Sequence, residues 1–162
     1  VASCIVRVED GLEIKTDSPV LLNLRKGVIE LLLARSPDSD KIRELAQKLG
    51  VGEPRFAPDD EKCILCGLCV RVCKEIAEAS AISFVNRGMK REVSGPFLER
   101  SESCIGCGGC AYVCPTKAIT IEDELVKLGD RVLGMLRKEK VEEVAGRLGI
   151  GTTREDGTLL DG

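Results

Sequence analysis

Histidine and tryptophan are both absent from the 162 residues, and the chain has one Tyr and three Phe. Without His, the chain cannot form a Ser-His-Asp triad, a His-ligated zinc site or a Rieske cluster. So few aromatic side chains, in a chain with a net charge of -3, argue against a surface that stacks nucleic-acid bases. We therefore expect no nucleic-acid partner and no chemistry based on imidazole.

Long hydrophobic runs are also lacking. The most apolar stretch, residues 20–34, is interrupted by charged residues such as Arg25 and Glu30, so it falls short of the roughly 18 residues that cross a bilayer. Charges at Arg7 and Glu9 interrupt the region where an export signal would lie. We expect a cytoplasmic chain that does not insert into a membrane.

Cysteine, in contrast, is abundant, and eight of the nine cysteines fall in an internal duplication. Each copy carries the spacing Cys-x2-Cys-x2-Cys-x3-Cys, with an offset of 41 residues, and Pro115 follows the second run. This is the spacing of bacterial [4Fe–4S] ligation, in which the fourth Cys of each run binds the other cluster. The predicted ligand sets are Cys63, Cys66, Cys69 and Cys114 for one cluster, and Cys104, Cys107, Cys110 and Cys73 for the other.

Zinc is the competing interpretation of these runs. Zinc ribbons place two Cys in each knuckle, whereas each run here has a third Cys at the same step and then a fourth. The pattern therefore favours two [4Fe–4S] clusters over zinc or redox-active thiols. Gly67 and Gly108 follow the second Cys of each run, where a residue without Cβ allows the loop to turn sharply around a cluster.

Cys4 lies outside both runs. In a strand-like sequence such as residues 4–6, we interpret it as a small buried hydrophobic residue. As a metal ligand it would need partner thiolates from another chain.

The pattern of apolar residues predicts a mixed α+β chain. Asp10-Gly11 predicts a hairpin between residues 3–8 and 12–15. Ser18-Pro19 predicts the start of a helix over residues 20–35. Its predicted buried face consists of Leu21, Leu24, Val28, Leu31 and Leu32.

A second helix is predicted over residues 39–49, where Gly50 ends it, and residues 51–61 are predicted to be a linker. Strand-like segments follow the cysteine runs at residues 81–84 and 118–121. Beyond residue 122 the leucines and valines predict an amphipathic helix, built on Leu125, Leu128, Val132, Leu133 and Leu136.

Residues 139–151 repeat six of thirteen residues of 40–52, which indicates either convergence of two capped helices or a duplicated docking element. The predicted domains are a hairpin plus helix (1–37), a helix and linker (38–61), a dicluster ferredoxin-like domain (62–122) and a helical C-terminal extension with a tail (123–162).

Several motifs, both around the cysteines and away from them, point to one family. They are residues 2–4, 8–19, 30–34, 54–56, 63–73, 84–88 and 110–118. Over residues 1–123 the chain resembles the iron–sulfur region of the large peripheral-arm subunit of respiratory complex I, which also occurs in NAD-linked hydrogenases, iron-only hydrogenases and some formate dehydrogenases. The resemblance implies a bacterial dicluster ferredoxin-like domain with helical N- and C-terminal extensions.

The departures from this family matter as well. Family members carry a [2Fe–2S] ferredoxin-type module at the start, and Cys4 matches only its last ligand. A His/Cys-ligated cluster normally follows Ala34, yet residues 35–48 contain neither residue. We expect neither additional cluster, and residues 1–37 then represent a remnant of the [2Fe–2S] module with a structural or docking role.

The resemblance implies a function in electron transfer, with no catalysis by the chain on its own. The chain would carry two [4Fe–4S] clusters inside a larger anaerobic oxidoreductase, beside a catalytic subunit and with room for a further electron-transfer subunit. The catalytic partner would be either a molybdenum- or tungsten-pterin enzyme (formate or aldehyde oxidoreductase, or class II benzoyl-CoA reductase) or a flavin/NAD complex of the hydrogenase type. The alternatives are a free dicluster ferredoxin and, with less support, an iron–sulfur redox sensor.

The ligand assignment makes a contrast between two cysteines testable. Cys4→Ala should leave the iron content of anaerobically purified protein unchanged, whereas Cys114→Ala should lower it by removing a ligand from the cluster of the first run. Iron and sulfide analysis of both variants measures the difference. Equal iron loss from the two variants would instead identify Cys4 as a ligand.

Overall fold

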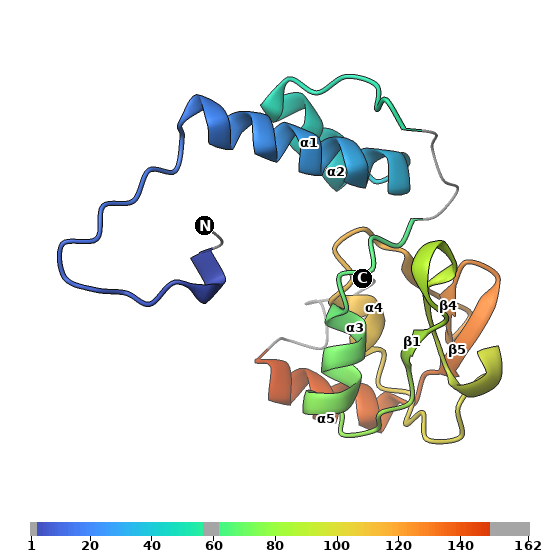
Figure 1. The fold of residues 1–162 in the computed structure, drawn as a ribbon. Coiled ribbons are helices and arrows are strands. Elements are labelled where there is room, and N and C mark those ends of the chain that lie inside the picture. Colours follow the sequence, from blue (N-terminus) through green and yellow to red (C-terminus); the bar gives the residue numbers. More distant parts are fainter. Residues whose placement is uncertain (1–2, 57–61, 150–162) are drawn as a thin grey trace, which may run out of the picture.

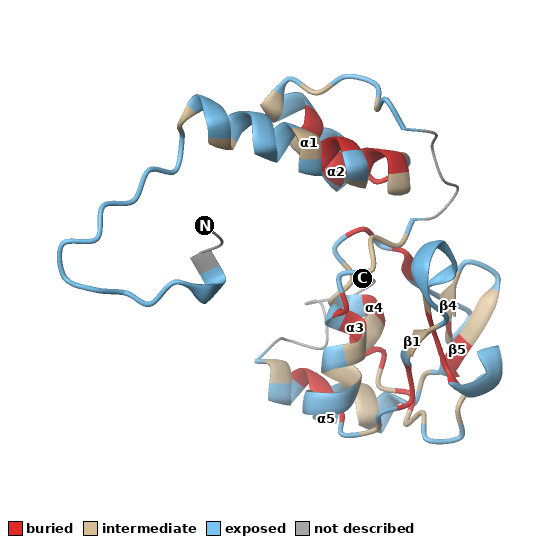
Figure 2. Ribbon diagram, viewed as in Figure 1, coloured by how far each residue is buried: buried red, intermediate tan, exposed pale blue. Residues whose placement is uncertain are grey.

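The computed structural model describes residues 3–56 and 62–149 (Figure 1). These residues form two separate hydrophobic cores. One core lies between helices α1 and α2, and the other lies within the cysteine-bearing domain. Figure 2 shows that the buried residues gather in these two places, while the first residues of the chain are exposed. Among the described residues, no helix has both the length and the apolar character needed to cross a membrane.

Helix α1 (Pro19–Arg35) begins where the sequence predicts, because the Ser18 hydroxyl accepts a hydrogen bond from the Leu21 amide (3.4 Å) and Pro19 occupies the first turn. The predicted buried face is wrong for most of its residues, although Leu32 is half-buried and packs against the core between α1 and α2. Leu24, Val28 and Leu31 are each more than half exposed, and the buried residues are Ile29, Glu30, Leu33 and Ala34. Apolar residues occupy several faces of α1, so their spacing alone does not select the face that meets α2.

Helix α2 (Asp40–Leu49) confirms the second predicted helix and ends at Gly50, which adopts the left-handed conformation (φ 66°). Ile42 and Ala46 of α2 pack against Ile29 and Leu33 of α1. Ile64, in the loop that carries the first cysteines, packs against this same core and joins the helical pair to the cysteine-bearing domain.

An ion pair fixes the segment that follows α2. Arg55 forms two short hydrogen bonds of 2.7 Å to the carboxylate of Glu30, and its own amide donates a third at 2.8 Å. These bonds from the Arg55 side chain and amide lower the pKa of Glu30 to about 2. The carboxylate therefore stays ionised far below neutral pH, and it ties residues 51–56 back to α1. Residues 57–61, the end of the predicted linker, lie outside the described residues.

The predicted N-terminal hairpin is wrong as far as its strands are concerned. Residues 3–17 contain the short 3-10 turn η1 (Ser3–Ile5) and a turn at Asp10-Gly11, where Gly11 has φ 84°, but no strand. Val8 and Ile14 are 90% and 73% exposed. A two-stranded ribbon is only marginally stable without a surface to cover one of its faces, and the described residues provide none here.

The cysteine-bearing domain is built from two copies of a loop, a short helix and a strand. The first copy has helix α3 (Leu68–Arg71), the π-helical turn η2 (Val72–Ile76) and strand β1 (Ser83–Val85). The second copy has helix α4 (Gly109–Tyr112) and strand β3 (Ile119–Glu122). Both predicted strand-like segments are therefore confirmed. Strand β1 pairs antiparallel with β2 (Glu92–Ser94), which lies between the two copies. One 3-10 turn follows each strand of this pair: η3 (Gly88–Lys90) after β1 and η4 (Pro96–Leu98) after β2.

The helix predicted from the leucines after residue 122 is wrong. This segment forms strands β4 (Leu125–Leu128) and β5 (Arg131–Met135), which extend β3 into an antiparallel sheet in the order β3-β4-β5. Asp123 and Glu124 both have positive φ (50° and 64°), as a two-residue hairpin turn between right-twisted strands requires. The leucine spacing fits a helix, but the Gly129-Asp130 turn breaks it in the middle.

Helix α5 (Lys138–Leu148) follows the sheet, and Val144 and Ala145 are its buried residues. It is the counterpart of α2 in the sequence repeat, and both helices end at a left-handed glycine, Gly50 or Gly149. The two helices pack against different partners: α2 packs on α1, and α5 packs on α4 and η2. The sequence repeat therefore extends to the caps of the two helices and not to the elements on which they pack.

The corrected face of α1 leads to a prediction for the helical pair. Ile42→Ala should lower the free energy of unfolding of the pair by about 2–5 kcal/mol, because Ile42 is only 3% exposed and packs on α1. Leu24→Ala, at a position 62% exposed, is the matched control and should change it by less than about 0.5 kcal/mol. Hydrogen exchange at the amides of α1 and α2 measures both effects. Equal destabilisation by the two variants would contradict the observed packing.

Candidate metal centre

The first of two enclosed cavities in the cysteine-bearing domain is bounded by four cysteines from both copies of the repeat. They are Cys63, Cys66, Cys69 and Cys114. Cys63 and Cys66 come from the loop before α3, Cys69 from α3 and Cys114 from the segment after α4. The rest of the lining is apolar apart from Thr116.

The second cavity has the same construction with the roles of the copies exchanged. Its cysteines are Cys73, Cys104, Cys107 and Cys110. Cys73 lies in the π-helical turn η2 and Cys110 in α4. Apolar residues and glycines form the remainder of the wall.

The cysteines that line each cavity are those of one predicted ligand set, and their role as ligands stays a prediction. In each run the first three cysteines face one cavity and the fourth faces the other. None of the nine cysteines, all of which the structure describes, forms a disulfide.

Burial makes the innermost thiols hard to ionise. Burial raises the pKa of Cys69 to about 12, and the charges of Cys63, Cys114 and Cys66 raise it further. Burial likewise raises the pKa of Cys107 and Cys110. Thiolates in such a site need a positive partner, and a metal is the partner that replaces the thiol proton.

Backbone amides point at the sulfurs from the loops. The Leu65 amide donates to Cys63 Sγ (3.4 Å), and the Ala81 amide donates to Cys73 Sγ (3.2 Å). Such hydrogen bonds stabilise negative charge on a cluster and tune its potential. Gly67 and Gly108 have φ of 79° and 67°, so the loops turn sharply at both predicted glycines.

Gly134 in β5 is a site residue that the sequence prediction missed. A Cβ placed on Gly134 would overlap Cys104 Sγ, so the strand can pass this cysteine only without a side chain. An isolated Gly within a strand signals such a close approach, but the helix predicted here concealed that signal.

The nine cysteines differ in exposure. Cys69 is buried and six others are half-buried, whereas Cys66 and Cys4 are exposed. The interpretation of Cys4 as a buried hydrophobic residue is therefore wrong: it lies in η1, in the exposed N-terminal segment. Lys74, the residue after Cys73, is exposed.

The arrangement of the cysteines indicates which kind of metal group they could hold. Within residues 3–56 and 62–149, three or more His, Cys, Asp or Glu side chains nowhere converge on one point as ligands of a lone ion would. The cysteines of each set instead surround a cavity that is almost entirely apolar. This arrangement fits a compact group with several metal atoms, because each sulfur can then bind a different iron.

The sequence of this chain is similar to those of several known proteins. Residues 62–118 match the family described as the 4Fe-4S dicluster domain. The chain is 29% identical over 147 residues to the mitochondrial NADH-ubiquinone oxidoreductase 78 kDa subunit of Neurospora crassa, an alignment that covers 74% of this chain and 20% of the relative. It is 30% identical over 120 residues to the NADP-reducing hydrogenase subunit HndD of Solidesulfovibrio fructosivorans, covering 59% of this chain and 20% of the relative.

A solved structure agrees with these relatives. The crystal structure of NAD+-reducing [NiFe]-hydrogenase in the H2-reduced state matches 72% of this chain and 62% of that chain, with a TM-score of 0.59 and 25% identity. The resemblance predicted from the sequence is confirmed. The chain spans about a fifth of the length of the curated relatives it matches.

The close approach of β5 to Cys104 leads to a prediction. Gly134→Ala should displace Cys104 and lower the iron content toward half, because only the second cavity is affected. Gly146→Ala in α5 is the control, since a Cβ there meets no atom within 4 Å. Iron analysis and visible absorption of the two variants measure the effect. Full iron content in Gly134→Ala protein would contradict this role for Cys104.

Proposed function

We propose that this chain is an electron-transfer subunit that carries two [4Fe–4S] clusters. Cys63, Cys66, Cys69 and Cys114 would hold the first cluster, and Cys73, Cys104, Cys107 and Cys110 the second. The observation that carries the proposal is the pair of apolar cavities, each bounded by three cysteines of one run and one of the other. The similarity of residues 62–118 to the 4Fe-4S dicluster domain supports it.

A bound cluster supplies reversible one-electron chemistry, and the residues of the chain set the conditions for it. Apolar side chains such as Ile82, Leu133 and Ile119 exclude water from the two sites. Cys69 of the first set and Cys110 of the second share one hydrophobic core, so the two sites adjoin inside a single packed unit. No side chain with an acid–base or nucleophilic role is needed, and the chain would act as a conductor for a catalytic partner.

The partner is proposed from the relatives. Those described above are named as NADH, NADP or NAD+ oxidoreductases or hydrogenases, which favours a flavin/NAD complex of the hydrogenase type over a molybdenum- or tungsten-pterin enzyme. Residues 1–37 and α2 would then serve as structural or docking elements toward that complex. Their exposed apolar side chains, such as those of Val8 and Val28, support an interacting role.

Metal analysis tests the proposal directly. Protein purified without oxygen should contain about eight irons per chain, because two four-iron clusters are expected, and should absorb broadly in the visible region. Reduction should produce a paramagnetic signal in electron paramagnetic resonance spectra.

Three results would contradict the proposal in different ways. Zinc as the only metal would overturn the iron–sulfur assignment, and about four irons per chain would remove one cluster. A monomeric native mass in anaerobic extract would support a free ferredoxin instead of a subunit.

A further inference from the structure

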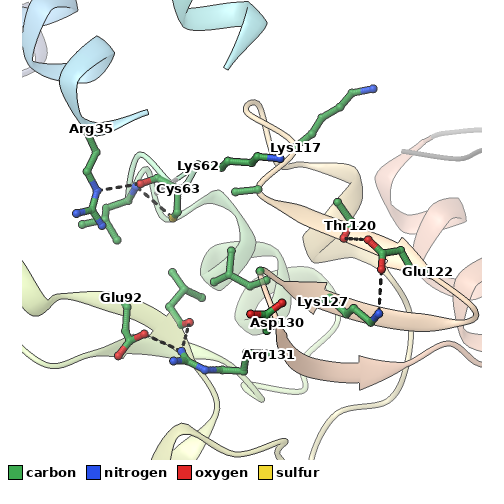
Figure 3. Close-up of a pocket in the computed structure, with 15 residues that line it drawn as sticks. Arg35, Lys62, Cys63, Glu92, Lys117, Thr120, Glu122, Lys127, Asp130 and Arg131 are labelled. Atoms are coloured by element: carbon green, nitrogen blue, oxygen red, sulfur yellow. Dashed lines mark hydrogen bonds and ion pairs between the residues drawn. The ribbon is translucent and has the colours of Figure 1, made fainter. Parts of the chain in front are cut away.

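An open cleft lies against the first cysteine of the repeat and adjoins the first of the two cysteine-lined cavities (Figure 3). Its walls come from the end of α1, the loop before α3, strand β2 and the sheet β3-β4-β5. Cys63 lines both this cleft and the first cavity, so the cleft reaches one proposed cluster site and not the other. At its edge, Arg35 Nε donates to the Cys63 carbonyl (3.2 Å).

The cleft is basic, although the chain as a whole is acidic. Five basic and three acidic residues line it, in a chain whose net charge is -3. Two of the acidic residues are already neutralised by ion pairs, Glu122 with Lys127 (2.9 Å) and Glu92 with Arg131 (2.8 Å). The surplus positive charge therefore lies elsewhere in the cleft.

Lys62 and Lys117 carry part of this surplus. Both are exposed, and Figure 3 shows their side chains on the same side of the cleft, away from the two ion pairs. They also line a neighbouring hollow beside the start of α2, together with Asp40. The other two acidic residues of this hollow are paired, Asp38 with Arg43 and Glu44 with Lys41 and Lys48. Within the part of the chain that the structure describes, neither Lys62 nor Lys117 has an ion-pair partner. Their ammonium groups are thus available to an anion from outside.

We propose that this cleft is the docking surface for an acidic segment of the protein that exchanges electrons with the chain, and that the exchange takes place at the first cluster site. The inference rests on the proposed function and adds the partner's chemistry and the entry point. The exposed cysteine of the two sets, Cys66, belongs to the first set, whereas all four cysteines of the second are half-buried. Opposite charge on the partner would steer it to this side of the molecule. The exchange moves one electron and neither forms nor breaks a covalent bond.

The first experiment measures docking alone, with a fluorescein-labelled hexaglutamate peptide as the acidic probe and the iron-loaded chain as the protein. Fluorescence anisotropy at low salt should show binding that weakens as the ionic strength rises. The double variant Lys62→Glu/Lys117→Glu should bind the peptide about tenfold more weakly. The control variant Lys26→Glu/Lys138→Glu makes the same charge change at exposed positions of α1 and α5 that do not line the cleft, and its binding should stay within about twofold.

The second experiment measures whether electrons leave the protein through this cleft. The reduced protein is mixed with an anionic cobalt(III)–EDTA complex or with a cationic cobalt(III)–phenanthroline complex, and each takes up one electron to become cobalt(II). The double variant should react about tenfold more slowly with the anionic complex, and no more slowly than the unchanged chain with the cationic one. A variant that slows both oxidants equally would have altered the redox potential rather than docking, and this would overturn the proposal.

Iron content and the paramagnetic signal of each variant separate this inference from the proposed function. Loss of both in the unchanged chain would refute the clusters themselves. Intact clusters with equal peptide binding by Lys62→Glu/Lys117→Glu and the control variant Lys26→Glu/Lys138→Glu would refute the docking surface alone, and so would a failure of the peptide to bind the unchanged chain at low salt.

Discussion

The crossing of the fourth cysteine from each run into the other run's cavity is the constraint on which the domain depends. Cys73 follows α3 in sequence but faces the cavity of the second run, and Cys114 follows α4 but faces that of the first. Neither copy of the repeat completes a site with its own residues. The two copies must therefore fold together, and the sulfurs lie where a domain of this size would otherwise place larger hydrophobic side chains.

This arrangement explains why the surrounding residues are small and their backbone is tightly turned. Glycines at the cavity walls allow close approach, as Gly134 does beside Cys104 and Gly106 does beside Met135 and Arg137. The sheet β3-β4-β5 and helix α5 then complete the outer wall of the same domain. Residues 123–149 are thus part of the cysteine-bearing domain.

The parts of the fold that the sequence predicts well are those controlled by local chemistry. The ends of α1 and α2 follow from Ser18-Pro19 and Gly50, and the cysteine sets follow from a spacing that has few other uses. The errors arise where tertiary contacts decide. Apolar side chains lie on several faces of α1, so only the contact with α2 shows which face is buried. The leucines of β4 and β5 have helical spacing, and only the turn at Gly129 shows that they belong to two strands. The close approach at Gly134 depends on that strand, so it could not be predicted without it.

The helical pair and the first metal site share structural parts. Arg35 and Ser36, at the end of α1, donate hydrogen bonds to the carbonyls of Cys63 and Lys62, and Ile64 lines the first cavity while packing against the α1–α2 core. Among the described residues, neither of the helices contributes to the wall of the second cavity. A protein that binds α1 and α2 would therefore contact elements that reach the first proposed cluster site and not the second. Its binding could then change the surroundings of the first site while leaving those of the second unchanged.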